Sequence, residues 1–110
     1  MDCIFCNIVS GEIPSDNVFE GERVLAFNDI KPSAKVHVLV IPKKHIASVI
    51  DLENTDAELM GEMVLVAKQI AKEKNLQGYK LAMNVGREGG QIVDHLHLHL
   101  LSPDVAGGHV

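Results

Sequence analysis

The sequence predicts an α+β fold, with a mainly antiparallel five-stranded sheet, one long helix and a short N-terminal helix. Three short segments of strand character precede a single segment with helical periodicity, and two more follow it. The chain of 110 residues contains no internal repeat or linker-like tract, so residues 1–110 are expected to form one domain. Apolar residues make up 46% of the sequence and aromatic residues only 4%, which predicts a mainly aliphatic core.

The first half of the chain is expected to supply the short helix and three strands. Residues 1–8 favour a helical turn. Residues 17–20 and 23–28 are short apolar segments, and the glycine between them predicts a hairpin with Gly21 in its turn. Residues 35–41 are rich in valine and alternate only partly, which predicts a central strand buried on much of both faces.

The second half is expected to supply the long helix and two further strands. Residues 55–75 carry a capping-box pattern, Thr55-x-x-Glu58, at their start. Apolar side chains recur there at helical spacing and form one stripe, which includes Leu59, Met63 and Ile70. Residues 79–84 predict a strand, and after a glycine-rich loop residues 92–101 predict a long final strand.

Composition excludes several kinds of protein. The formal net charge of −5 argues against a chain that coats nucleic acid or an anionic membrane, so neither is expected as a partner. No apolar segment approaches the roughly 20 residues that cross a bilayer, and the first residues lack a secretory pattern, so we expect a cytoplasmic protein. A reducing compartment disfavours a disulfide between Cys3 and Cys6, which leaves metal ligation or two free thiols.

Histidine and leucine alternate in the segment His95-Leu96-His97-Leu98-His99-Leu100. On a strand, all three imidazoles would project from one face, and the leucines would enter the core from the other. Such a row could bind a catalytic metal, or it could act directly on phosphate and protons. The preceding Gly89-Gly90-Gln91 favours phosphate, because glycine lets backbone N–H groups approach an anion closely.

With Leu101, this segment matches the His-φ-His-φ-His-φ-φ signature of the histidine triad (HIT) superfamily, where φ is apolar. The resemblance extends over residues 3–101, and the chain's length and its Ile-Pro-Lys-Lys-His-Ile segment resemble most the Hint branch of purine nucleoside phosphoramidases. The other similar segments are Ile4-Phe5, Glu12-Ile13-Pro14, Leu25-Ala26-Phe27, Asp29-Ile30, Val40 to Ile46, Asn84 and Gly89-Gly90-Gln91.

The resemblance implies a hydrolase that uses covalent histidine catalysis. His97 would attack the α-phosphorus of a nucleoside phosphoramidate or a related AMP-type nucleotidyl compound, and water would hydrolyse the nucleotidyl-histidine. His99 and His37 would contact the phosphate and help the leaving group to depart. No metal is required for this catalysis. The resemblance also implies a homodimer.

The same resemblance implies where a purine nucleotide would lie. Asp29 would accept hydrogen bonds from the ribose hydroxyls, and Gly90 and Gln91 would lie along the phosphate. The remaining expected nucleotide-binding residues are Asn84 and the apolar base slot of Phe5, Ile8, Phe27 and Ile30. Ile92 stands where the Hint branch generally has serine, so this chain lacks a hydroxyl that could donate to phosphate or to the leaving amine.

Cys3-x-x-Cys6 has the spacing of half a tetrahedral zinc site. Some bacterial HIT proteins that this sequence resembles complete the site with two histidines, which correspond here to His45 and His95. The resemblance therefore implies a structural Zn²⁺ that leaves His97 and His99 free. Two other functions stay open: a metal-dependent hydrolase that uses the histidine row, and a nucleotide-binding module with little turnover.

Overall fold

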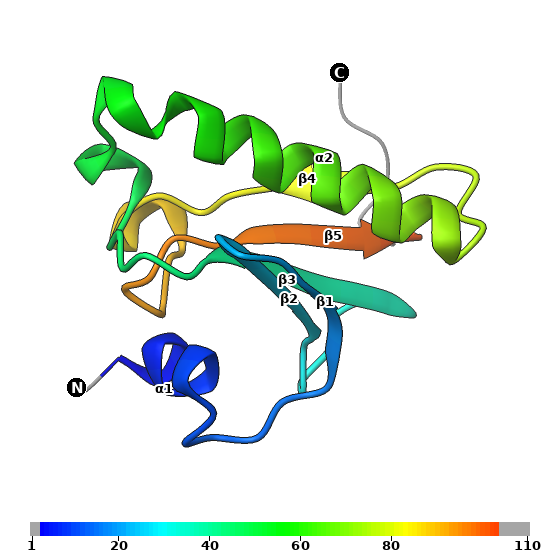
Figure 1. Cartoon of the computed structure of the whole chain (residues 1–110). Helices are drawn as coiled ribbons and strands as arrows, with labels where there is room; N and C mark the ends of the chain where they lie inside the picture. The colour runs from blue at the N-terminus through cyan, green and yellow to red at the C-terminus, as the bar shows by residue number, and fades with distance from the viewer. Residues whose placement is uncertain (1–2, 104–110) are drawn as a thin grey trace.

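A five-stranded antiparallel sheet in the order β1-β2-β3-β5-β4 forms the centre of the protein (Figure 1). The computed structural model describes residues 3–103 and confirms the predicted α+β fold with one long and one short N-terminal helix. The strands are β1 (Asn17–Glu20), β2 (Val24–Asn28), β3 (Val36–Pro42), β4 (Lys80–Ala82) and β5 (Leu98–Ser102). The helices are α1 (Ile4–Ser10), α2 (Ala57–Glu73) and the short 3-10 turns η1 (Val49–Asp51), η2 (Asn54–Asp56) and η3 (Arg87–Gly89).

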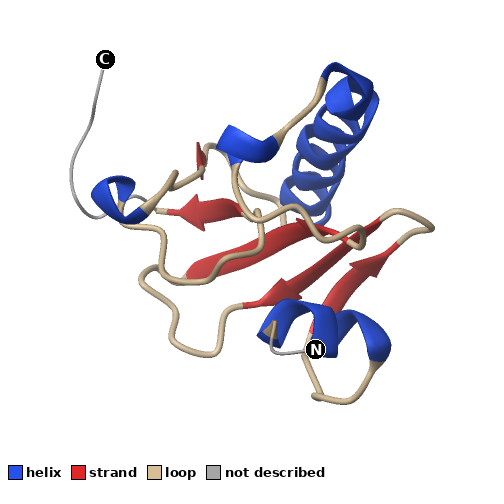
Figure 2. Cartoon of the chain, turned by 90° about the vertical axis from the view of Figure 1, so that its left-hand side faces the viewer, coloured by secondary structure: helices blue, strands red, loops and turns tan. Residues whose placement is uncertain are grey.

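The two α-helices cover opposite faces of the sheet (Figures 1 and 2). Alternate residues of β2 and β3 explain this, because successive strand side chains point to opposite faces. One set packs with the apolar stripe of α2 and comprises Val24, Ala26, Val38 and Val40. The other set packs with Phe5 of α1 and comprises Leu25, Phe27, Leu39 and Ile41. The predicted burial of the central strand on both faces is therefore confirmed.

The last strand is shorter than predicted. Residues 92–97 lie outside β5. Backbone groups in this segment form hydrogen bonds with a side chain and with a loop instead of with a neighbouring strand. The Val93 carbonyl accepts from Gln91, and the Leu96 N–H donates to the Ile46 carbonyl at 2.7 Å. The alternation still holds, since Leu96, Leu98 and Leu100 all join the core beneath α2.

The predicted capping box of the long helix is wrong. Thr55 lies in the turn η2, and α2 begins at Ala57. Asp56 closes the turn instead: its carboxylate accepts from the Glu53 N–H and from Lys44 Nζ, at 2.9 and 2.8 Å. The pairing of β1 with β2 confirms the predicted hairpin. Residues 1 and 2 of the predicted N-terminal turn lie outside the described residues. Within residues 3–103, no helix combines the length and the hydrophobicity needed to cross a membrane.

Candidate functional site

Three imidazoles from two neighbouring strands meet on the α1 side of the sheet. His37 comes from β3 and His99 from β5, while His97 immediately precedes β5. Their ring centroids form a continuous row, with 5.1 Å between His37 and His99 and 4.9 Å between His99 and His97. Residues predicted to act on phosphate therefore lie side by side.

His97 has a defined proton position. Its Nδ1 lies 2.7 Å from the His95 carbonyl oxygen, and because a carbonyl can only accept, Nδ1 must carry the proton. Nε2 then bears the lone pair when the ring is neutral. The side chain is 9% exposed, and the edge of Phe5 packs against it with ring centroids 5.2 Å apart. A buried, oriented imidazole with a free Nε2 can act as a nucleophile.

The His37–His99 pair is kept neutral by its surroundings. His37 Nε2 lies 2.9 Å from His99 Nδ1. Burial, with smaller contributions from His97 and His37, lowers the pKa of His99 to about 4. Burial also lowers the pKa of His37 below its usual range, although the Asp29 carboxylate opposes this effect. His99 Nε2 is buried and has no hydrogen-bond partner within the described part of the chain.

Asp29 lies next to this pair. Its Oδ2 is 3.5 Å from His37 Nε2, and its Oδ1 accepts from the Lys31 N–H at 2.8 Å. The backbone N–H of Asp29 donates to the His37 carbonyl at 2.9 Å, which closes the loop between β2 and β3. The carboxylate is therefore held at the edge of the histidine row.

The apolar residues predicted to hold a base are only partly assembled. Phe5 and Phe27 make an edge contact with ring centroids 5.5 Å apart, and Ile8 packs against the same cluster. Ile30 is 89% exposed and stands apart from that cluster.

The glycine-rich loop is held by hydrogen bonds to the Gln91 side chain. Gly86 and Gly90 have φ of +67° and +86°, values that favour glycine. The Gln91 side chain is buried: its Oε1 accepts from the Gly86 N–H at 3.0 Å, and its Nε2 donates to the carbonyls of Ala47 and Val93. The side-chain amide of Gln91 therefore organises the loop.

An ion pair that was not predicted from the sequence stabilises the same loop. Arg87 donates to both carboxylate oxygens of Asp94 at 2.9 Å, and also to the Gln91 carbonyl at 2.6 Å. The N–H groups of Gly90 and Gln91 are used inside the loop, whereas those of Ile92 and Val93 find no acceptor in residues 3–103. Asn84, predicted at the nucleotide site, is exposed beside Gly90.

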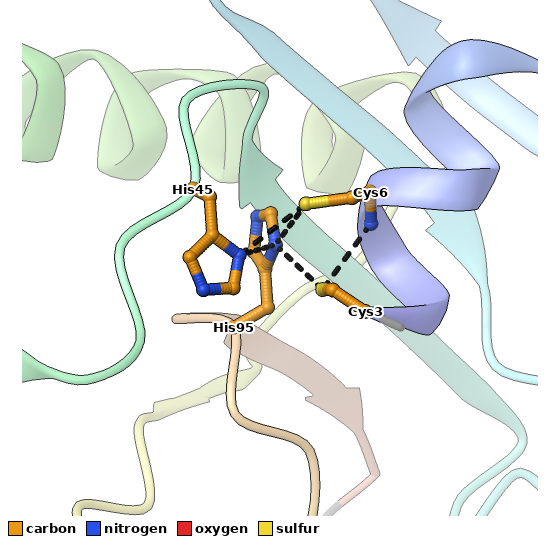
Figure 3. A group of neighbouring side chains, drawn as sticks. All are labelled: Cys3, Cys6, His45 and His95. Carbon is orange, nitrogen blue, oxygen red and sulfur yellow. Dashed lines mark hydrogen bonds between the residues drawn. The ribbon is translucent and has the colours of Figure 1, made fainter. Parts of the chain in front are cut away.

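The four residues predicted to bind zinc lie together (Figure 3). Cys3 caps α1 and Cys6 lies in its first turn, while His45 follows β3 and His95 precedes β5. Their ligand atoms all lie within 4.8 Å of one another. The Nδ1 atoms of His45 and His95 are 3.2 Å apart, and three sulfur–nitrogen distances are 3.3, 3.3 and 3.6 Å.

The nitrogen–nitrogen and sulfur–nitrogen distances of 3.2–3.6 Å are close to those between the ligand atoms of a tetrahedrally coordinated ion. Usual Zn–S and Zn–N bond lengths place the ligand atoms about 3.3–3.8 Å apart. His95 Nε2 donates to the Pro42 carbonyl at 2.8 Å, so its Nδ1 lone pair faces the two sulfurs, as in many metal-binding histidines. Burial lowers the pKa of His95, which keeps that lone pair free. Burial and the neighbouring Cys3 raise the pKa of Cys6 to about 11, and a cation would favour its thiolate. The residues present therefore fit a metal ion.

Known proteins resemble this chain in sequence and in fold. A family model described as scavenger mRNA decapping enzyme C-term binding matches residues 2–109. An uncharacterized HIT-like protein of Synechococcus elongatus is 46% identical over 101 residues, which are 91% of this chain and 89% of that protein. A crystal structure of a HIT family hydrolase from Legionella pneumophila is 47% identical, with a TM-score of 0.89 over 99% of this chain and 95% of that one. A histidine triad protein from Clostridium difficile is 46% identical, with a TM-score of 0.94 over 100% of this chain and 97% of that one.

The fold and the site define a small α+β protein in which a row of histidines adjoins a cysteine–histidine cluster able to hold a metal ion. The chain belongs to the histidine triad superfamily.

Proposed function

We propose that this protein is a hydrolase that cleaves nucleoside 5′-phosphoramidates, or related AMP-type nucleotidyl compounds, through a covalent intermediate on His97. The orientation of His97 carries the proposal. The His95 carbonyl holds the proton on Nδ1, so the lone pair of Nε2 is free to attack phosphorus. The Legionella relative is named a hydrolase, which supports the same broad class of activity.

The reaction has two displacement steps. His97 Nε2 forms a bond to the α-phosphorus while the phosphorus–nitrogen bond to the leaving amine breaks, and the amine keeps the electron pair and takes up a proton. Water then attacks phosphorus, the bond to His97 breaks, and a nucleoside monophosphate and the free imidazole remain. An imidazole suits both steps, because it is nucleophilic when neutral and leaves readily.

The residues around His97 would bind the substrate. The unpartnered Nε2 of His99 would contact a phosphoryl oxygen or the leaving group, with His37 behind it. The loop shaped by Gly90 and Gln91 would bring the free N–H groups of Ile92 and Val93 to the phosphate. Asp29 would hold the ribose hydroxyls, and Asn84 would contact the nucleotide beside Gly90. The apolar slot of Phe5, Ile8, Phe27 and Ile30 would receive a purine.

The cysteine–histidine cluster would hold a structural Zn²⁺ through Cys3, Cys6, His45 and His95. Two thiolates and two imidazoles form a ligand set that leaves no open position, so the ion would cross-link α1 to the segments beside β3 and β5. A reducing compartment such as the cytoplasm would keep both cysteines as thiols.

A homodimer is part of the same proposal. Apolar side chains remain exposed on the outer side of α2 and on the edge strand β4 and the residue before it: Val64, Leu65, Tyr79 and Leu81. A two-fold symmetric contact would bury them.

The test is hydrolysis of adenosine 5′-phosphoramidate, with the release of AMP and ammonia followed by chromatography. Samples quenched early are analysed by mass spectrometry for an adenylyl group on His97. The same assay after removal of bound metal decides between the candidate functions. Activity that disappears with the metal while the fold persists would favour a metal-dependent hydrolase, and AMP binding without turnover would favour a nucleotide-binding module.

The metal-dependent alternative has less structural support. Among the described residues, the group with metal-ligand geometry includes His95 but not His97 or His99. Of the three histidines in the alternating segment, only His95 would then bind a metal, and His97 and His99 would act on the substrate.

A further inference from the structure

The loop between β2 and β3 contacts the back of the histidine row through a backbone group. The Ser33 N–H donates to His37 Nδ1 at 3.1 Å, and the Ser33 hydroxyl lies 3.4 Å from the same atom. The loop is short and closed at its base by the bond from the Asp29 N–H to the His37 carbonyl. Ser33 therefore faces the imidazole from a fixed position.

A backbone N–H can only donate, so His37 Nδ1 must accept and cannot carry a proton. A neutral His37 then has its proton on Nε2. The alternative tautomer would place two N–H groups against each other at Ser33. It would also turn the Nε2 lone pair toward the Asp29 carboxylate, 3.5 Å away. Two independent neighbours thus favour the same tautomer.

The proton on His37 decides the proton on His99. His37 Nε2–H lies 2.9 Å from His99 Nδ1, which must therefore accept. Neutral His99 carries its proton on Nε2, the buried atom that has no partner within the described residues. Burial lowers the pKa of both rings, so both are neutral at pH 7.5 and each has a single ring proton.

We propose that Ser33 is a positioning residue: its backbone N–H fixes the proton of His37 on Nε2 and, through His37, the proton of His99 on Nε2. The site then contains two complementary nitrogen atoms on adjacent rings. His97 Nε2 presents a lone pair, which can attack phosphorus, and His99 Nε2 presents an N–H, which can donate to the substrate. The effect of this arrangement on turnover rests on the proposed function. The assignment of the two tautomers does not depend on it.

The direct test needs no variant. Nitrogen-15 NMR of the imidazoles in the intact protein at pH 7.5 distinguishes protonated from unprotonated ring nitrogens. We expect protonated Nε2 and unprotonated Nδ1 in both His37 and His99. A proton on Nδ1 of either ring would overturn the inference, even if the protein hydrolyses phosphoramidates. The expected tautomers in a protein without that activity would refute the proposed function alone.

Two variants test whether the Ser33 N–H is the cause. Ser33→Pro removes the N–H, and Ser33→Ala removes only the hydroxyl. For a folded Ser33→Pro protein we expect mixed His37 tautomers and a kcat lower by about tenfold, with KM changed less than about twofold, as for one misplaced hydrogen bond. Ser33→Ala should keep the wild-type spectrum and kcat.

Melting curves establish whether each variant is folded. A folded Ser33→Pro protein with wild-type His37 tautomers would overturn the positioning role. A Ser33→Ala protein as impaired as Ser33→Pro would assign the effect to the hydroxyl, which contradicts the proposal equally. Should Ser33→Pro fail to fold, the wild-type spectrum still decides, because a proton on His37 Nδ1 is incompatible with an accepting role at that atom.

Discussion

The carbonyl oxygen of His95 accepts the Nδ1 proton of His97 at 2.7 Å, while the imidazole of His95 lies in the cysteine–histidine cluster. One residue therefore belongs to both sites: its side chain can bind a metal ion, and its backbone orients the proposed nucleophile. Phe5 makes a second connection, since it lies between Cys3 and Cys6 in sequence and packs against the rings of His95 and His97. The proposed metal site and the proposed nucleophile are therefore connected through both His95 and Phe5.

Replacement of His97 tests the proposed nucleophile. His97→Ala should lower turnover of adenosine 5′-phosphoramidate by several orders of magnitude, because it removes the imidazole whose Nε2 lone pair is oriented by the bond from Nδ1 to the His95 carbonyl. AMP affinity, measured by calorimetry, should stay within about threefold of wild type, since the glycine-rich loop and Asp29 are unchanged. Near-normal turnover, or an adenylyl group trapped on another residue, would contradict the assignment.

Removal of the two thiols tests the metal site. Cys3→Ser/Cys6→Ser should lose bound zinc in elemental analysis and melt at least about 5 °C lower, the shift expected from about 1 kcal/mol in a domain of this size. Substantial turnover should remain, because the proposed ligands do not include His97 or His99. Ser10→Ala, on the same helix but away from the cluster, should keep both the metal and the melting temperature. Zinc-free wild-type protein purified without chelators would refute the site.

The Ile92 position tests how the chain treats the leaving group. Ile92 is 84% exposed and follows the loop residue Gln91. Ile92→Ser adds a hydroxyl at this point, and one hydrogen bond to a charged group, worth roughly 1.5–3 kcal/mol, should raise kcat/KM by about tenfold. Ile92→Ala is the matched control, since it removes the same bulk without adding a donor. Equal gains in both variants would assign the effect to size, and no gain in either would mean that the leaving group is handled elsewhere.

The sequence predicted which side chains lie on each face of the sheet better than it predicted where the strands and helices begin and end. Alternation placed the leucines of the final segment under α2 and the histidines on the other side, because side-chain direction in an extended chain follows from local geometry. The start of β5 depends on Gln91, which bonds through its side chain, and on Ile46, which is distant along the chain. Local patterns carry no information about such partners.

The same contrast applies to the site. The four cluster residues came from a resemblance that joined Cys3-x-x-Cys6 to two distant histidines, and they lie together in the structure. The Arg87–Asp94 ion pair and the Ser33 contact to His37 were missed. Both contacts depend on the conformation of a loop. In addition, the Ser33 donor is a backbone N–H, which almost every residue type has, so the sequence does not reveal it.

The lowered pKa of the partly buried His99 predicts how stability depends on pH. In the unfolded chain this histidine binds a proton below its ordinary pKa of 6.5, whereas in the native state it stays neutral down to about 4. The unfolded state therefore binds more protons between these values, and stability should fall as the pH is lowered through that window. His99→Gln should flatten the slope of melting temperature against pH between 6.5 and 4, whatever its effect at pH 7.5. Lys72→Gln, on exposed α2 surface, is the control and should keep the wild-type slope. An unchanged slope in His99→Gln would show that His99 is readily protonated in the folded protein.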